Sequence, residues 1–172
     1  MEQPCSTKFD ARELRKVFGC FATGVAVVTT IDQQSQPRGL TVNSFTSVSL
    51  EPPLVLICVR KTAPMCEVFL NSDAFAINIL ARHQQSLSAQ FCTPLADKFA
   101  GVNWSASLTG SPVISDVLAH LDCKRYGFIE AGDHLVLLGQ VVDFASRGTE
   151  PLIFNQGAYA ALAKLELQGA KL

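Results

Sequence analysis

Short segments rich in β-branched and aliphatic residues dominate the sequence, and turn-forming residues separate them. The longest pair covers residues 119–130 and 134–144 and flanks Ala131-Gly132-Asp133, the composition of a tight turn between antiparallel strands. A second predicted hairpin joins the segments 25–31 and 39–43. About seven such strands, without regular strand–helix alternation, predict a mainly β protein with a Greek-key type antiparallel barrel rather than a doubly wound parallel sheet.

Few helices are expected. Asp10 can cap a first helix, with Glu13 completing a capping box, and this helix should end between Gly19 and Gly24. A short helix should begin near Pro64, and residues 84–91 should form another. The apolar run Leu54-Val-Leu-Ile-Cys-Val59 predicts a strand buried on both faces. Residues 1–172 are expected to form a single domain, with a core of about 9–162 and loose termini.

The charge content limits the possible partners. Charged residues make up 17% of the chain, below the usual ~25%, while 48% is hydrophobic, so some surface should be covered in an assembly. No apolar run approaches the ~20 residues that cross a bilayer, so we expect no membrane span. A net charge of -1 offers no basic field for nucleic acid. The N-terminal sequence lacks the layout of a secretory signal, so we expect a cytoplasmic protein.

The cysteines do not form a metal-binding pattern. Six cysteines are spaced without a Cys-x-x-Cys pair, and only three histidines could complete a site. His120 and Asp122 near Cys123 would supply too few ligands, because alternate strand residues must share a face to meet. We therefore expect reduced thiols and no metal. Phosphate-loop and nucleophile motifs are also absent from the sequence.

One polar segment stands between two apolar strands. Thr41, Asn43, Ser44 and Ser47 lie within ten residues that also contain Thr46 and Ser49. Hydroxyls and backbone N–H groups at this density suit a polar ring edge and a phosphate. The alternative is a half-exposed strand whose Ser and Thr side chains face water.

Cations follow the buried strand. Arg60-Lys61-Thr62 lies between that strand and the helix start at Pro64, a place that suits an anion, although it is equally the composition of a solvated strand end. Lys98 is a second candidate phosphate ligand or an ordinary surface lysine. His134 follows the Gly132-Asp133 turn and could donate to a nicotinamide carboxamide or a phosphate, or simply begin a strand.

The order of these motifs resembles the flavin reductase-like family, the small reductase components of two-component flavin monooxygenases. The resemblance covers about residues 9–162, and four segments carry it: Phe18-x-x-Phe21-Ala-Thr-Gly-Val-Ala-Val-Val-Thr-Thr30, Gly39-Leu-Thr-Val-Asn-Ser-Phe-Thr-Ser-Val-Ser-Leu-Glu-Pro-Pro-Leu-Val55, Asp97-Lys-Phe-Ala-Gly101 and Gly132-Asp-His134.

This resemblance implies a split β-barrel homodimer that holds FMN or FAD and takes a hydride from NADH or NADPH. It also implies release of the reduced flavin to a separate oxygenase component. No residue would act as a catalytic acid or base, because hydride passes directly to the flavin. Carried over by position, the flavin contacts would be Thr41, Asn43, Ser44, Ser47, Arg60, Lys61, Thr62, Ser88, Phe91 and Lys98, and His134 would face the nicotinamide nucleotide.

Two departures from the family pattern and three other functions remain open. The segment Phe154-Asn-Gln-Gly-Ala-Tyr159 lacks the basic residue that the family often has before Gly-x-Tyr, and the loop 60–63 has fewer hydroxyls than the family's Ser-rich form. The alternatives are a flavin-binding electron carrier, a flavin-dependent oxidase or reductase of another small substrate, and a non-catalytic dimeric barrel.

Overall fold

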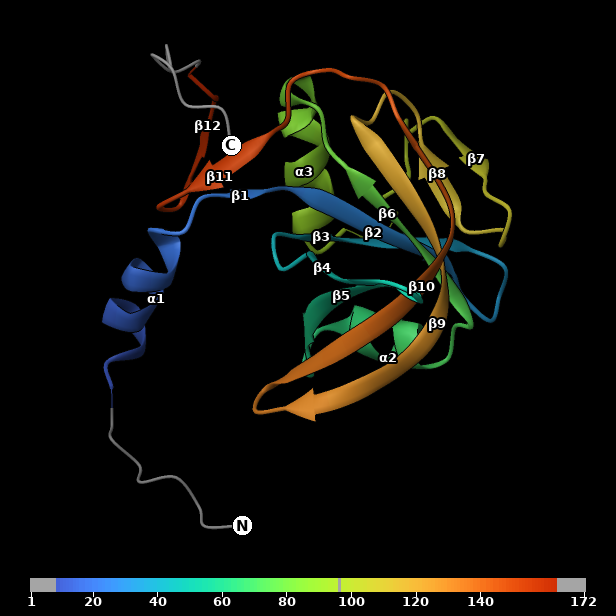
Figure 1. Ribbon diagram of the computed structural model, residues 1–172, viewed down its shortest axis with the longest axis horizontal. Helices are drawn as coiled ribbons and strands as arrows, with labels where there is room; N and C mark the ends of the chain where they lie inside the picture. The colour runs from blue at the N-terminus through green and yellow to red at the C-terminus, as the bar shows by residue number, and fades with distance from the viewer. Residues whose placement is uncertain (1–8, 96, 164–172) are drawn as a thin grey trace.

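The computed structural model of the chain describes residues 9–95 and 97–163 (Figure 1). The termini that we expected to be loose lie outside the described residues. The helices are α1 (Ala11–Gly19), α2 (Pro64–Leu70) and α3 (Gln85–Cys92), and the 3-10 turn η1 (Arg82–Gln84) precedes α3. The strands are β1 (Thr23–Gly24), β2 (Ala26–Ile31), β3 (Pro37–Val42), β4 (Thr46–Leu50), β5 (Pro53–Arg60), β6 (Ala74–Ile79), β7 (Trp104–Ala106), β8 (Pro112–Ile114), β9 (Ala119–Ala131), β10 (His134–Ser146), β11 (Ile153–Asn155) and β12 (Ala158–Ala160).

Seven antiparallel strands form the main sheet in the order β3-β2-β6-β9-β10-β5-β4. The two edge strands, β3 and β4, are consecutive in the chain, and only residues 43–45 connect them. Such a link spans about 14 Å at ~3.5 Å per residue, so the sheet must curl until its edges approach each other. Among the described residues no ladder joins β3 to β4, and the barrel is therefore split. The expected antiparallel barrel is confirmed in this form.

Three hairpins and one long crossover build this sheet. The predicted hairpins β2–β3 and β9–β10 are confirmed, and β4–β5 is the third. β5 and β6 follow each other in the chain through α2, yet the β9–β10 hairpin lies between them in the sheet. This non-local return is the Greek-key element of the fold. None of the helices formed by the described residues has the length and apolar character that a bilayer crossing requires.

Two apolar clusters form the core. The first lies within the barrel and contains Ile57, Phe69, Phe75 and Leu137. In the second, Phe91 of α3 packs with Val27 of β2 and other apolar side chains. A Cβ atom on Gly39 would lie 2.6 Å from the Phe91 ring, so β3 can pass over α3 only where it carries no side chain.

Strand β5 is buried on one face only. Val55, Ile57 and Val59 are buried, whereas Leu54, Leu56 and Cys58 are half-buried. The prediction of burial on both faces is therefore wrong. A continuous apolar run is typical of a parallel strand between two helix layers, but in a barrel alternate residues point inward and outward.

Helix α1 buries none of its residues against the rest of the chain. Asp10 caps it, because its Oδ1 accepts from the backbone N of Arg12 at 2.7 Å. The predicted capping box does not form, since Glu13 pairs instead with Lys16 at 2.7 Å. Figure 1 shows α1 apart from the main sheet, beside the turn between β11 and β12.

Candidate functional site

The ends of β5 and β10 bring together the candidates Arg60, Lys61 and His134. Arg60 lies opposite His134 in the β5–β10 ladder. The backbone N of Lys61 donates to the carbonyl of Asp133 at 3.0 Å, which extends the pairing by one residue. These three residues therefore share one end of the barrel.

Carboxylates partly neutralise this group. Lys61 Nζ lies 2.8 Å from Glu130 Oε2, and His134 Nδ1 lies 2.8 Å from Asp133 Oδ1. The hydrogen bond from Lys61 lowers the pKa of Glu130, and the hydrogen bond with His134 lowers the pKa of Asp133. Both carboxylates are exposed, so these pairs orient the side chains more than they stabilise the fold.

The β3–β4 loop lies against the same part of β5. Ser44 Oγ donates to the carbonyl of Cys58 at 3.0 Å, and it accepts from the backbone N of Cys58 at 2.9 Å. This hydroxyl therefore holds the loop onto β5, two residues before Arg60. Asn43 and Ser47 are exposed on either side of it and remain available to a ligand.

A second group of candidates ties α3 to the sheet. Thr41 Oγ1 donates to the carbonyl of Ser88 at 2.8 Å, and Tyr159 donates to Ser88 Oγ at 2.9 Å. Ser88 is 1% exposed and thus acts between elements of the fold. This role of Tyr159 could not be predicted from the sequence, because its partner Ser88 lies 71 residues earlier in the chain.

Phe91 and Lys98 form a pair with different roles. The Phe91 side chain has no exposed surface, so in this conformation it cannot touch a ligand. Its carbonyl accepts from Lys98 Nζ at 2.7 Å, and Gln90 Nε2 donates to the Lys98 carbonyl at 2.9 Å. Burial lowers the pKa of Lys98, and the nearby Cys92 opposes this shift. Phe91 therefore helps to position a half-buried cation.

A cavity of about 890 Å³ adjoins these residues. It lies between the β2–β3 turn, α2 and the segment around Lys98, and Leu40 and Met65 contribute apolar surface. Ala63, which follows Thr62, also lines it. The cavity thus reaches Lys98 and the residue after Thr62, whereas Arg60, Lys61 and Thr62 do not line it. Its wall around Asp32 and Arg38 was not predicted, because in the sequence these residues look like an ordinary hairpin turn.

The described residues contain no group of three or more His, Cys, Asp or Glu side chains arranged to hold a metal ion. In particular, Asp122 is fully buried and bonds instead to Thr109, accepting from its backbone N at 2.8 Å and from its hydroxyl at 2.6 Å. This carboxylate anchors the loop before β8.

Comparison with known proteins assigns this arrangement to a family. The model of the flavin reductase like domain matches residues 18–163. The chain belongs to the flavin reductase-like family. The match includes the polar segment around Ser44, the cationic segments and His134, so the resemblance drawn from the sequence is confirmed.

Members of the family from several bacteria are similar to this chain. The stachydrine N-demethylase reductase subunit of Rhizobium meliloti is 45% identical over 153 residues, which cover 89% of this chain and 66% of the relative. The reductase component of the flavin-dependent trigonelline monooxygenase of Acinetobacter baylyi is also 45% identical over 153 residues, covering 89% of this chain and 49% of that protein. The chain thus spans about half to two thirds of the length of these curated relatives.

A solved structure in the family has the same fold. The NADH:FAD oxidoreductase of Streptomyces globisporus, in complex with NAD and FAD fragments, superposes with a TM-score of 0.85 at 40% sequence identity. The superposition covers 90% of this chain and 93% of that chain. The split barrel is therefore the architecture of a flavin reductase.

Proposed function

We propose that this flavin reductase-like chain is an NAD(P)H:flavin oxidoreductase. It would transfer a hydride from NADH or NADPH to FMN or FAD and supply reduced flavin to a partner monooxygenase. The observation that carries the proposal is the placement of Lys98 and of the segment after Arg60-Lys61-Thr62 beside one cavity of about 890 Å³. A cavity of this size is typical of a small-molecule or cofactor site.

Of the candidate residues, Lys98 lines the cavity and the others lie outside its lining, and together they carry the groups that a flavin needs. Asn43 and Ser47 expose an amide and a hydroxyl near the Cys58 end of β5, and such groups can bond the polar edge of an isoalloxazine ring. Arg60 and Lys61 follow at the end of β5, and Lys98 lines the cavity from the segment after α3, so cations are present for a phosphate. The donor set therefore contains both kinds of partner that a flavin nucleotide requires.

The proposed role of the protein is to align the flavin with the nicotinamide donor. When bound, a flavin supplies the hydride acceptor for a nicotinamide donor. Ser44 fixes the loop that carries Asn43, because its hydroxyl is bonded on both sides to the Cys58 backbone. Asp133 orients the His134 ring through the 2.8 Å bond to Nδ1, which leaves Nε2 for the nicotinamide nucleotide. Neither residue needs to act as a catalytic acid or base.

A spectrophotometric assay tests this function. The purified chain is mixed with NADH or NADPH and with FMN or FAD, and absorbance at 340 nm is followed. We expect rapid oxidation that depends on added flavin. Oxidation that requires only a tightly bound flavin would instead favour an electron carrier, and no oxidation with any pair would refute the proposal.

Replacing His134 with alanine should raise the KM for NADH several-fold, with a smaller change in kcat. The imidazole lies half-buried at the start of β10 and is held by Asp133, so its loss removes a positioning contact and no chemical step. Steady-state kinetics with saturating flavin measure the effect. His83→Ala, which removes an exposed histidine of η1, is the matched control, and unchanged kinetics in His134→Ala would contradict the assignment.

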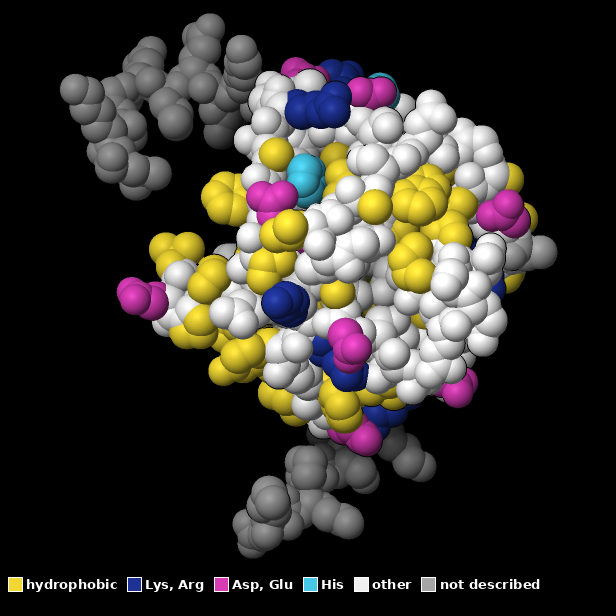
Figure 2. Space-filling view, turned by 90° about the vertical axis from the view of Figure 1, so that its right-hand side faces the viewer, with side chains coloured by type: hydrophobic (Ala, Val, Ile, Leu, Met, Phe, Trp, Pro, Cys, Tyr) yellow, Lys and Arg dark blue, Asp and Glu magenta, His cyan; other side chains and the backbone are white. Residues whose placement is uncertain are grey.

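We also propose that the chain acts as a homodimer. Helix α1 exposes Leu14, Val17 and Phe18, Phe21 follows it and is exposed too, and none of the helix residues is buried in its own chain. Other exposed apolar side chains lie on β4, β9 and β10, namely Val48, Leu50, Tyr126, Phe128, Ile129 and Phe144. Figure 2 shows the side of the molecule that faces away from α1, where hydrophobic side chains lie between scattered Lys, Arg, Asp and Glu side chains. A second copy covering α1 would account for the low charge content.

A charge introduced on α1 tests the dimer. Phe18→Glu should convert a dimeric wild type into a monomer in sedimentation velocity at micromolar concentration, because a carboxylate would be buried without a partner. Leu108→Glu is the control, since Leu108 is equally apolar and 76% exposed but lies in the β7–β8 turn. A monomeric wild type would contradict the proposal.

The proposed setting is the cytoplasm, with one domain of about residues 9–162 carrying the function. The five described cysteines, Cys20, Cys58, Cys66, Cys92 and Cys123, all have free thiols. This state fits a reducing compartment. The proposed partner, an oxygenase component, would receive reduced flavin there.

A further inference from the structure

Helix α3 holds Lys98 at two points. The Phe91 carbonyl accepts from Lys98 Nζ at 2.7 Å, and Gln90 Nε2 donates to the Lys98 carbonyl at 2.9 Å. The next residue, Phe99, packs edge-on against the Phe91 ring, with 5.0 Å between the ring centroids. Because both hydrogen bonds come from neighbouring residues of α3, the position of this helix sets the position of the Lys98 ammonium.

One residue of α3, Ser88, receives hydrogen bonds from two other elements. Thr41 Oγ1 of β3 donates to the Ser88 carbonyl at 2.8 Å, and the Tyr159 hydroxyl of β12 donates to Ser88 Oγ at 2.9 Å. Ser88 is 1% exposed, so water cannot easily replace either partner. Phe91 lies one helical turn after it. Ser88 is therefore the point at which two strands hold the helix that carries the Lys98 contacts.

Tyr159 reaches Ser88 from a small separate sheet. This sheet has the order β1-β11-β12, so β12 is an edge strand that pairs only with β11. The Tyr159 ring packs edge-on against Phe154, with 5.7 Å between the centroids. At the β11–β12 turn, the backbone N of Gln156 donates to the Gly19 carbonyl of α1 at 2.9 Å. The hairpin is thus held by β1 and α1, and the Tyr159 hydroxyl connects it to α3.

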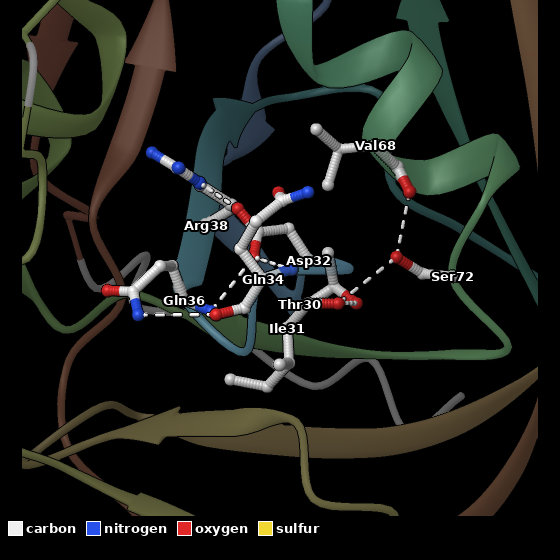
Figure 3. A network of polar contacts seen from close by, with 8 residues as sticks. All are labelled: Thr30, Ile31, Asp32, Gln34, Gln36, Arg38, Val68 and Ser72. Carbon is white, nitrogen blue, oxygen red and sulfur yellow. Dashed lines mark hydrogen bonds and ion pairs between the residues drawn. The ribbon is translucent and has the colours of Figure 1, made fainter.

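The cavity walls formed by the β2–β3 turn and α2 are fixed without Tyr159 (Figure 3). Asp32 Oδ2 lies 2.6 Å from Arg38 Nε, which closes the turn. Ser72 Oγ donates to the Val68 carbonyl at 2.7 Å, at the end of α2. Loss of the hydroxyl bond to α3 should therefore change the position of Lys98 and leave these two walls in place.

We propose that Tyr159 is a positioning residue for flavin binding, because its hydroxyl fixes α3 through Ser88 and α3 holds the Lys98 ammonium for the flavin phosphate. This inference rests on the proposed function, and it adds a residue that acts through another side chain. FMN and FAD both carry this phosphate, so both should be affected alike. A neutral hydrogen bond contributes less than a bond to a charged group, so its loss should weaken flavin binding about three- to tenfold.

Two variants remove the same bond from opposite sides. Tyr159→Phe removes the hydroxyl and keeps the ring that packs against Phe154. Ser88→Ala removes the acceptor oxygen. Tyr126→Phe is the matched control, because Tyr126 is the other tyrosine of the chain and lies 57% exposed on β9.

The first measurement is flavin affinity, from the change in FMN or FAD fluorescence without NADH or NADPH. We expect the Kd for both flavins to rise about three- to tenfold in Tyr159→Phe and in Ser88→Ala, and to stay at the wild-type value in Tyr126→Phe. The double variant should bind no more weakly than the weaker single variant, because one bond is lost in each case. The KM for flavin should rise with the Kd, whereas kcat should change much less. Additive losses in the double variant, or an unchanged Kd in Tyr159→Phe, would overturn the proposal.

The second measurement follows Lys98 itself and needs no flavin. Acetic anhydride at limiting concentration acetylates lysine amines, and mass spectrometry gives the labelling of Lys98 relative to Lys124, an exposed lysine of β9. Tyr159→Phe should raise this ratio about twofold or more, because the bond from Lys98 to the Phe91 carbonyl is weakened. An unchanged ratio would refute the positioning role. Should wild type reduce neither flavin, the proposed function fails, and the labelling still decides whether Tyr159 positions Lys98.

Discussion

Replacing Lys98 with methionine should raise the KM for both FMN and FAD about 10- to 100-fold. The wild-type ammonium is half-buried and positioned by the Phe91 carbonyl at 2.7 Å, and no carboxylate of the described residues lies within ion-pair distance of it. A hydrogen bond to a charged group contributes about 1.5–3 kcal/mol, which corresponds to this range of affinity. Methionine keeps an unbranched side chain of similar length, so most of the packing should survive.

Two measurements distinguish a ligand contact from a structural role. Initial rates as a function of flavin concentration should show the change in KM with kcat reduced much less, and thermal unfolding should show a loss of only about 1 kcal/mol for the bond to Phe91. Lys124→Met is the control, because Lys124 is an exposed lysine of β9 outside the site. A large loss of stability with an unchanged KM would contradict the assignment of Lys98 to the phosphate.

Replacing Asn78 with leucine should lower the free energy of unfolding by about 2–4 kcal/mol, because buried polar groups would lose their partners. Asn78 is fully buried on β6. Its Nδ2 donates to the Val27 carbonyl at 3.1 Å and to Thr29 Oγ1 at 3.0 Å, and its Oδ1 accepts from the backbone N of Ile114 at 2.8 Å. The side chain thus attaches β8 to the sheet, and leucine can make none of these bonds.

Urea denaturation at fixed protein concentration measures this loss, and hydrogen exchange at the Ile114 amide locates it. Asn71→Ala is the control, because Asn71 is exposed and its side chain makes one hydrogen bond, to the Glu67 carbonyl. That variant should lose less than about 1 kcal/mol. If Asn78→Leu lost as little, the attachment of β8 would depend on apolar contacts alone.

The strands that the sequence predicted best are those with local pairing. The β9–β10 hairpin could be predicted because Ala131-Gly132-Asp133 brings its two halves together within three residues. By contrast, β1, β7, β8 and β12 contain two or three residues each, too few for any periodicity to appear. β7–β8 and β11–β12 are local hairpins of three-residue strands, whereas β1 pairs with the distant β11.

Among the candidate site residues, long-range bonds separate the contacts available to a ligand from those that hold the fold. Thr41, Ser44 and Ser88 have the same hydroxyl chemistry as Ser47, but their oxygens bond to residues between 14 and 71 positions away. Phe91 is an aromatic residue near the site, yet it lies under Gly39. A sequence records the residue type and the spacing, whereas these partners are set only when the sheet curls.

The residues of the cavity wall could not be predicted from the sequence either. Asp32 and Arg38 form the ends of a turn, and their sequence indicates only a hairpin. They become part of a possible binding site because α2, thirty residues later, folds back beside them. Pocket residues drawn from three separate segments have no common sequence pattern.

The exposed position of α1 has a consequence for how the protein assembles. A nine-residue helix is marginal in water without tertiary contacts, and α1 buries no residue in its own chain. In the proposed homodimer its helical state would therefore depend on mass action. Diluting the protein would melt α1 as the subunits separate, so a loss of helical circular dichroism would accompany dissociation, and subunit concentration would govern the order of the chain's first helix.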